Sequence, residues 1–135
     1  MSDHNARIID EFRSNNGRVG GNFEDAPLLL LHSSGARSGE ERVSPMMYLA
    51  DGDRYLVFAS YAGADINPAW YHNLTAHPEA RIEVGDESVS VRAVELQGSE
   101  RDQWYAEQAR RYPGFAAYED KTTRRIPVMA LTPEV

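Results

Sequence analysis

The apolar residues of this chain come in short runs separated by turn signals, and this spacing restricts the fold more than any other feature. One such run, residues 27–32 (PLLLLH), ends in a stretch rich in serine and glycine. No apolar run approaches the roughly 20 residues of a membrane-spanning helix. A continuous apolar run of this length before a turn is typical of a strand buried on both faces. The chain therefore predicts a protein built largely from short strands, with no stable membrane insertion.

Six segments have the length and composition of strands: 27–32, 43–49, 54–60, 81–84, 87–96 and 126–131. Short turns such as 51–53 (DGD) join several of them, which favours antiparallel pairing. Pro45 cannot donate to a strand ladder, so it indicates an edge, a bulge or a strand end. The apolar phase slips by one residue after Ala93, which indicates a bulge or a barrel corner. These features predict a mainly β, α+β protein whose six antiparallel strands form a small closed or split β-barrel.

Three or four short helices complete the predicted fold. Residues 3–14 read as an amphipathic helix. It is expected to dock onto the barrel, with a lid or a membrane-surface segment as alternatives. Asn67 suits an N-cap and Pro68 a first helical turn, so a helix is expected to begin there and to end before residue 78. A further helix is expected over 100–112, followed by a turn at 115–118.

The chain has 135 residues and shows no linker or repeat, so residues 1–135 are expected to form one domain. Within it, residues 1–17 form an N-terminal helix that either packs on the barrel or is mobile. Lysine and arginine total 14 against 21 aspartate and glutamate residues, a net charge of −7. Such an acidic chain is a poor nucleic-acid binder. The absence of cysteine and of a signal-peptide h-region predicts a cytoplasmic protein, either free or peripheral to a membrane.

The segment 33–48 (SSGARSGEERVSPMMY) carries the groups best suited to binding an anion. It holds two glycines and two guanidiniums, Arg37 and Arg42, and three of its serine hydroxyls, those of Ser33, Ser34 and Ser38, lie around the glycines. Glycine lets backbone N–H groups approach a ligand, and serine hydroxyls and arginine forks suit phosphate or carboxylate. Two glutamates lie between the arginines, however. The segment therefore predicts either an anion-binding loop or an ordinary solvated hairpin.

The helix that begins near Asn67 directs its positive dipole end to the region just after a strand, which suits electron-rich ligand atoms. His72 and His77 are five residues apart and do not share a helical face as metal ligands. The chain has no H-E-x-x-H motif, and no metal site is predicted.

Five motifs, in order, resemble one family: LLLLHSSGARSGEERVSPMMYL, YLVFAS-x-x-G, NPAWYHNL, YPGFAAY and IPVMAL. They resemble the deazaflavin-dependent nitroreductases, which are split β-barrel flavin/deazaflavin oxidoreductases with an FMN-binding split-barrel-like fold. The resemblance extends over residues 8–131. It implies the cofactor F420, whose tail carries a phosphodiester and glutamates. It also implies transfer of a hydride from F420H2 to an activated double bond or a nitro group of a small organic substrate.

The resemblance also implies roles for particular residues. The expected cofactor-binding residues are Arg37, Ser38, Arg42, Pro45, Met46, Met47, Ser60, Tyr61, Ala62, Gly63, Pro68, Ala69, Trp70 and Tyr71. Asn73 would fix the helix that carries the last of them. The expected substrate-binding residues are Tyr112, Phe115 and Tyr118. Of these, Tyr118 or Tyr112 is the candidate catalytic proton donor, and bulk water is the rival source.

At two positions this chain departs from the family pattern, and these departures narrow the expected electron acceptor and the expected set of anion contacts. Many members carry tyrosine where Phe115 stands, which points away from nitroimidazole activation and leaves an enone or another activated double bond as the acceptor. Members often carry lysine where Tyr61 stands, so an anion contact of the family is replaced here. Two alternatives stay open: an FMN-dependent oxidoreductase of the same fold, and a non-catalytic barrel that binds a cofactor or a lipid. The expected assembly is a monomer or a homodimer.

Overall fold

The computed structural model describes residues 3–15, 27–60, 63–64 and 66–134. Within these ranges the chain forms four helices and seven strands. The helices are α1 (Asp3–Ser14), α2 (Ala69–Ala76), α3 (Gly98–Arg111) and α4 (Gly114–Lys121). The strands are β1 (Leu28–Ser34), β2 (Glu41–Met47), β3 (Leu49–Asp51), β4 (Arg54–Phe58), β5 (Glu79–Val84), β6 (Glu87–Glu95) and β7 (Val128–Pro133).

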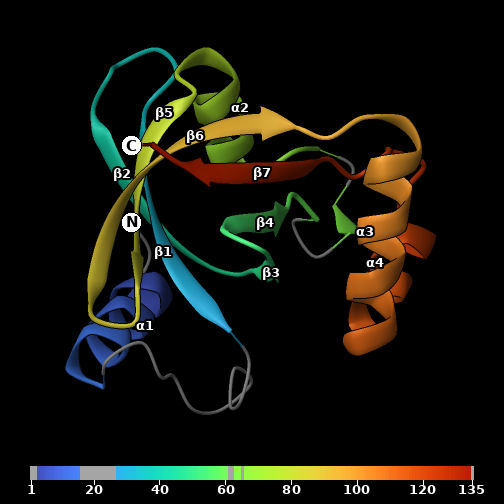
Figure 1. Cartoon of the computed structure of the whole chain (residues 1–135), viewed down its shortest axis with the longest axis horizontal. Helices are drawn as coiled ribbons and strands as arrows, with labels where there is room; N and C mark the ends of the chain where they lie inside the picture. The colour runs from blue at the N-terminus through green and yellow to red at the C-terminus, as the bar shows by residue number, and fades with distance from the viewer. Residues whose placement is uncertain (1–2, 16–26, 61–62, 65, 135) are drawn as a thin grey trace.

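All seven strands belong to one antiparallel sheet in the order β2-β1-β5-β6-β7-β4-β3, which curls into a half-barrel (Figure 1). The prediction of six strands was wrong because the expected strand 43–49 is divided at Tyr48. Before Tyr48 the chain pairs with β1, and after it the chain pairs with β4. A single strand cannot follow both neighbours, since they lie in different parts of the sheet. The edge position of β2 agrees with the presence of Pro45.

The curl of the sheet arises where β6 changes neighbours. Its first part pairs with β5 and its last part with β7, and the two registers overlap only at Val91 and Arg92. Neither register contains an extra residue, so of the two predicted alternatives, a bulge or a barrel corner, the bulge is absent. The apolar phase shifts for a different reason. Val94 is 54% exposed, while Leu96, whose N–H still donates to the Val128 carbonyl of β7 at 2.9 Å, is buried in the cluster shared with α3.

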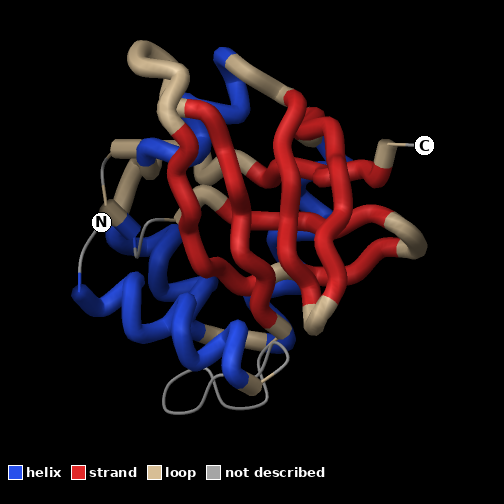
Figure 2. The backbone as a smooth tube through the Cα atoms, turned by 90° about the vertical axis from the view of Figure 1, so that its left-hand side faces the viewer, coloured by secondary structure: helices blue, strands red, loops and turns tan. Residues whose placement is uncertain are grey.

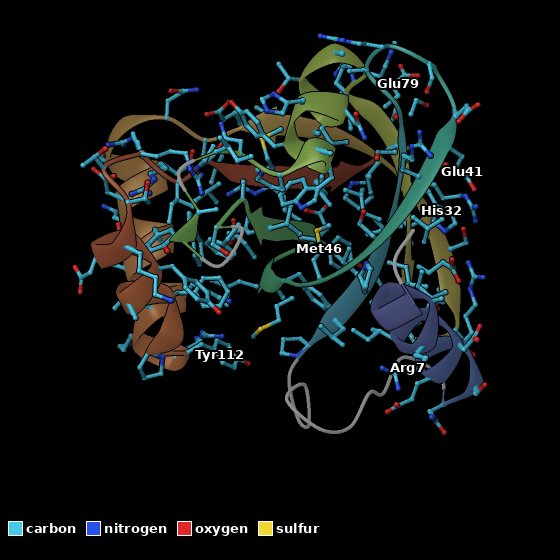
Figure 3. The ribbon with its side chains drawn as sticks, turned by 180° about the vertical axis from the view of Figure 1, so that it is seen from behind. Arg7, His32, Glu41, Met46, Glu79 and Tyr112 are labelled. Atoms are coloured by element: carbon cyan, nitrogen blue, oxygen red, sulfur yellow. The ribbon has the colours of Figure 1, made fainter. Side chains whose placement is uncertain are left out.

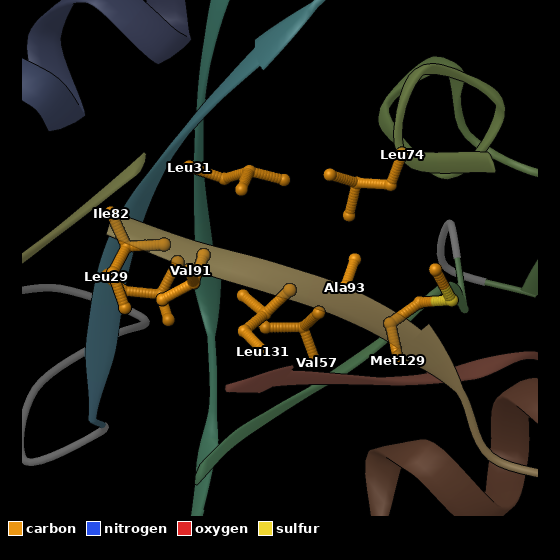
Figure 4. Close-up of a cluster of buried hydrophobic side chains, with 9 residues drawn as sticks. All are labelled: Leu29, Leu31, Val57, Leu74, Ile82, Val91, Ala93, Met129 and Leu131. Atoms are coloured by element: carbon orange, nitrogen blue, oxygen red, sulfur yellow. The ribbon is translucent and has the colours of Figure 1, made fainter. Parts of the chain in front are cut away.

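The concave face of the sheet encloses the main hydrophobic cluster (Figure 4). Its members are Leu29, Leu31, Val57, Leu74, Ile82, Val91, Ala93, Met129 and Leu131. Five strands supply eight of them, and α2 supplies Leu74, which points toward the sheet in Figure 4. Burial of such side chains contributes about 1.5–3 kcal/mol each. This cluster therefore fixes α2 over the open side of the half-barrel.

Two further clusters attach the remaining helices. The residues shared between α3 and the β4–β7 end of the sheet are Leu49, Leu56, Phe58, Leu96, Tyr105, Ile126, Val128 and Ala130. The third cluster joins α1 to the outer face of β1 and comprises Ile8, Ile9, Phe12, Leu28 and Leu30. Because Leu28 and Leu30 face α1 while Leu29 and Leu31 face the concave cluster, β1 is buried on both faces, as its sequence predicted. Figure 2 shows the strands as one curved body with helices beside it.

A charged contact supplements the apolar docking of α1. Arg13 donates from Nε and Nη2 to the two carboxylate oxygens of Glu83 on β5, at 3.2 and 2.7 Å. The buried ring of His32 places Nε2 2.5 Å from the same carboxylate. The bonds from Arg13, together with that to His32, lower the pKa of Glu83 to about 2. The ionised carboxylate thus links α1 to two neighbouring strands.

We expect Glu83→Gln to make the free energy of unfolding less dependent on pH. A carboxylate with a folded pKa of about 2, against 4.5 when unperturbed, stabilises the fold above pH 4.5 and loses this effect as the pH falls toward 2. At neutral pH the variant should be less stable by about 1–2 kcal/mol, which is the contribution expected of a partly exposed charge-assisted hydrogen bond. Urea titrations between pH 7 and 3 measure the difference, which should shrink with acidification. Glu87→Gln, on the same hairpin, is the control. A constant difference would contradict the role of Glu83.

Candidate functional site

A cavity of about 650 Å³ lies between the β1–β2 turn, β2 and the first half of α2. The residues that line it are Gly35, Ala36, Arg37, Ser38, Glu41, Arg42, Val43, Ser44, Ala69, Trp70, His72 and Asn73. The polar residues come mainly from the turn and from β2, while Ala69 and Trp70 supply an apolar wall. Cavities of this size are typical of small-molecule and cofactor sites.

The turn at the mouth of this cavity is closed by its own backbone. The N–H of Gly35 donates to the carbonyl of Glu40 at 2.8 Å, and the N–H of Gly39 donates to the carbonyl of Gly35 at 2.9 Å. The Ser38 hydroxyl oxygen accepts from the N–H of Glu40 at 3.1 Å. A Cβ at Gly35 would stand 2.6 Å from that oxygen, and Gly39 has a φ of +71°. The turn therefore requires glycine at position 39, and a side chain at position 35 would displace the Ser38 hydroxyl.

Asn73 of α2 ties the turn to the helix across the cavity. Its Oδ1 accepts from the backbone N–H of Ala36 at 3.0 Å, and its Nδ2 donates to the hydroxyl of Ser33 at 3.4 Å. The Asn73 side chain is buried, so its bond to Ser33 is shielded from water and its bond to Ala36 is partly shielded. The turn and the helix are thus held at a fixed separation, the role expected for Asn73.

The charges at the cavity favour an anion. Arg42 approaches Glu40 at 3.5 Å, but both side chains are more than half exposed, and such a pair contributes at most about 1 kcal/mol. A bound anion can therefore compete for the guanidinium. Glu41, the acidic lining residue, is engaged elsewhere: its carboxylate lies 3.2 Å from His32 Nδ1 and 3.9 Å from an Arg81 nitrogen. These contacts offset the negative charge of Glu41.

Five of the residues expected to bind a cofactor meet at this cavity: Arg37, Ser38, Arg42, Ala69 and Trp70. They come from two segments about 30 residues apart. The sequence interpretation did not include Ser44 as a site residue. The sequence did contain a signal that Ser44 belongs to the site. Alternate residues of a strand face the same side, and Ser44 follows Arg42 by two positions.

The adjacent methionines of β2 point in opposite directions. Met46 packs against the concave cluster, and Met47 packs against the cluster under α1. In Figure 3, Met46 lies near the middle of the molecule, with Glu41 to one side and Tyr112 to the other. Tyr71, also expected at the cofactor, packs against the concave cluster and donates its hydroxyl to Glu95 at 2.7 Å. Burial, followed by this bond, raises the pKa of Tyr71, so its hydroxyl keeps its proton.

The segment between β4 and α2 contains another group of expected contacts. Ser60 is 8% exposed, and Tyr61 and Ala62 lie outside the described residues. Gly63 has a φ of +81°, and a Cβ there would stand 3.0 Å from the carbonyl oxygen of Tyr118 on α4. The close approach of segment and helix therefore depends on glycine.

Asn67 does not cap α2, contrary to the prediction. The N-cap position is Pro68, which makes no side-chain cap hydrogen bond, and the helix begins at Ala69. The Asn67 side-chain oxygen instead accepts from Arg124 Nη1 at 2.6 Å. The Asn67 oxygen that was expected to cap the helix thus accepts a hydrogen bond from Arg124, 57 residues away in the sequence.

The expected substrate residues lie on the helical pair α3–α4. The Phe115 ring makes edge contacts with Phe58 and Tyr118, at centroid distances of 5.9 and 5.3 Å. The Tyr105 hydroxyl donates to the Phe115 carbonyl at 2.7 Å, which holds the start of α4 against α3. Tyr112 is the C-cap residue of α3. Among the described residues, the lining of the 650 Å³ cavity includes none from these helices.

Within the part of the chain that the structure describes, no group of three or more histidine, aspartate or glutamate residues could hold a metal ion. None of the described helices has the length and apolar character needed to cross a membrane.

Comparisons with known proteins place the chain among deazaflavin enzymes. The family model described as F420H(2)-dependent quinone reductase matches residues 6–133. An F420H(2)-dependent quinone reductase of Mycobacterium tuberculosis is 38% identical over 125 residues, which are 90% of this chain and 84% of the relative. These matches confirm the resemblance to deazaflavin-dependent reductases.

Two solved structures share both fold and sequence. An F420H2-dependent reductase superimposes with a TM-score of 0.71 at 36% identity, covering 78% of this chain and 93% of the other. A second structure, described as a domain-swapped dimer, has a TM-score of 0.73 at 32% identity and covers 93% and 92% of the two chains.

We expect Asn73→Ala to loosen the β1–β2 turn. The substitution leaves the partly buried N–H of Ala36 without its acceptor, which should lower the free energy of unfolding by about 1–3 kcal/mol. Hydrogen exchange of residues 35–40 should accelerate. Thr75→Ala, which removes an exposed hydroxyl from the same helix, is the control and should leave this exchange unchanged. Unaltered exchange in the Asn73 variant would show that the turn holds without it.

Proposed function

Because the chain belongs to the family of F420H2-dependent quinone reductases, we propose that it transfers a hydride from F420H2 to a quinone or to another acceptor with an activated double bond. The observation that carries the proposal is the cavity beside α2, which combines two guanidiniums at its rim with an aromatic wall. The coenzyme combines an anionic tail with a flat ring system, so its two parts match the two parts of the cavity. Nitro compounds, which like quinones are electron-poor, are a second class of acceptor.

The residues present fit this coenzyme. Guanidiniums bind phosphate and carboxylate oxygens through paired N–H donors, and Arg37 and Arg42 offer two such forks at one cavity. Ser38 adds a hydroxyl, and Gly35 leaves space that any side chain would fill. These residues would hold the anionic tail of the coenzyme. Ala69 and Trp70 would contact the apolar portion of the coenzyme.

We propose that the other expected contacts complete the cofactor site. They are Pro45, Met46, Met47, Ser60, Tyr61, Ala62, Gly63, Pro68 and Tyr71. Met46 lies between Glu41, which lines the cavity, and Tyr112 in the view of Figure 3. This position supports the assignment, because a ring system reaching from the cavity toward Tyr112 would pass Met46.

Reduction of a quinone to a quinol consumes one hydride and one proton. When bound, F420H2 supplies the hydride. Tyr118 or Tyr112 would donate the proton to the quinone oxygen, and Phe115 would exclude water beside them. The edge contact between Phe115 and Tyr118 supports this role, since it restricts the orientation of the tyrosine ring.

The wider context is proposed on the same basis. Residues 1–135 would form a single domain of the split-barrel type, active in the cytoplasm either free or at the membrane surface. The likeness to a domain-swapped dimer supports a homodimer over a monomer.

The test is a hydride-transfer assay with the purified protein. Reduced F420 and, separately, reduced FMN are mixed with the protein and a soluble quinone, an enone or a nitroaromatic compound. Recovery of the oxidised F420 absorbance with the quinone is the expected result. Oxidation of reduced FMN alone would favour an FMN enzyme of the same fold. Tight binding of both without turnover would favour a binding protein, and either result would overturn the proposal.

We expect Arg37→Ala to weaken F420 binding by about 1.5–3 kcal/mol, or roughly 10- to 150-fold, through loss of a charge-assisted hydrogen bond. Fluorescence titration of F420 measures the affinity. Arg92→Ala is a matched control, because Arg92 is an exposed arginine on β6 whose partner is Glu79. An unchanged affinity would remove Arg37 from the site.

Tyr118→Phe should lower turnover by roughly 100-fold, the lower end for a general acid, with little change in F420 affinity. Steady-state rates at saturating F420H2 measure this, and Tyr112→Phe provides the parallel test of the other candidate. If both variants turn over as fast as the wild type, the proton comes from water.

A further inference from the structure

Arg124, in the connection between α4 and β7, places all five of its guanidinium N–H donors in hydrogen bonds. Nη1 donates to the carbonyl of Ala59 at 2.9 Å and to Asn67 Oδ1 at 2.6 Å. Nη2 donates to the carbonyls of Ser60 and Ala64, both at 2.9 Å. Nε donates to the same Ala64 carbonyl at 3.1 Å. The half-buried guanidinium is thus fully satisfied.

Every acceptor belongs to one segment, residues 59–67, which joins β4 to α2. Three of the four acceptors are main-chain carbonyls, so the contact holds the path of the chain rather than a particular side chain. The neighbouring Arg125 differs: its side chain is 59% exposed and contacts Asp102 and the Gly98 carbonyl. Arg125 is therefore a surface group, whereas the half-buried Arg124 bonds the main chain of segment 59–67.

The segment 59–67 is also held from its other side. Gly63 approaches α4 so closely that a Cβ would stand 2.9 Å from the Cβ of Lys121 and 3.0 Å from the Tyr118 carbonyl oxygen. Its own N–H donates to the Ser60 carbonyl at 2.9 Å. The described residues of the segment therefore contact both Arg124 and α4.

This segment connects the two parts of the proposed cofactor site. At one end it carries Ser60 and Gly63, and at the other it leads directly into Pro68 and the first turn of α2. Ala69 and Trp70 of that turn line the cavity that holds Arg37. A change in the path of the segment would therefore shift the aromatic wall relative to the anion-binding rim.

We propose that Arg124 is a positioning residue for F420: by bonding the carbonyls of segment 59–67 it preorganises this segment and the start of α2 before the cofactor binds. The inference rests on the proposed function. A preformed site avoids the ordering cost of binding, so a chain that populates the competent path one tenth of the time binds tenfold more weakly. Lysine cannot replace this arginine, because an ammonium has three donors and no planar fork.

The experiment compares Arg124→Lys with Arg125→Lys, which alters the adjacent surface arginine. Fluorescence titration with F420 should show an affinity about tenfold or more lower for the first variant and unchanged for the second. The KM for F420H2 should rise in the same proportion while the KM for the quinone stays within about twofold.

Hydrogen exchange separates positioning from general destabilisation. In the free Arg124→Lys protein, exchange should accelerate in residues 59–70 but not in the β5–β6 hairpin, and saturating F420 should restore the protection. Asn67→Ala provides a second variant if the first does not fold. It removes one acceptor of four and should weaken F420 binding in the same direction, by a few-fold.

Three results would count against the inference. Equal F420 affinity in the wild type and in these variants would overturn it and leave the proposed function intact. Faster exchange throughout the sheet would assign Arg124 a purely structural role. Failure of the wild type itself to oxidise F420H2 would overturn the proposed function, and the inference with it.

Discussion

The burial of β1 on both faces is the constraint on which the rest of the structure depends. Leu29 and Leu31 enter the concave cluster, while Leu28 and Leu30 support α1. A strand enclosed in this way has one register and one direction, because a slip of one residue would exchange its two faces. Its end is therefore fixed, and the turn that follows it meets α2 at a defined place. The cavity exists because that meeting point is fixed.

Arginine serves two opposite purposes in this protein. At the cavity, Arg37 and Arg42 are exposed, and among the described residues the ion pair that competes for them is the weak one between Arg42 and Glu40, so their forks can bind an anion. In the connection before β7, Arg124 uses the same fork to gather carbonyl oxygens, and it has no donor left for a ligand. The difference follows from burial: an internal guanidinium must be satisfied by the protein, and an exposed one is satisfied by water until a ligand replaces it.

The two halves of the proposed site come from opposite ends of the sheet. The turn proposed to bind the anion follows β1, and Phe115 and Tyr118 of α4 pack against the cluster at the β4–β7 end. Segment 59–67 runs between them and is held by both Arg124 and α4. This arrangement explains why a reductase of this size can combine a polar binding rim with an apolar reaction surface. The concave cluster separates the two and gives each its own surroundings.

The sequence by itself determined the features that depend on neighbouring residues. The buried strand at 27–32, the hairpin around Gly85, the tight glycine turn and the amphipathic helix at 3–14 all follow from local pattern and turn chemistry. Tertiary structure alone decided the division of 43–51 into two strands, the partner of Asn67 and the role of Arg124. The pairing of Arg124 with Asn67 joins residues 57 positions apart, and no local pattern can indicate such a contact. Local signals specify which elements form, whereas the enclosure of polar groups depends on how distant elements pack.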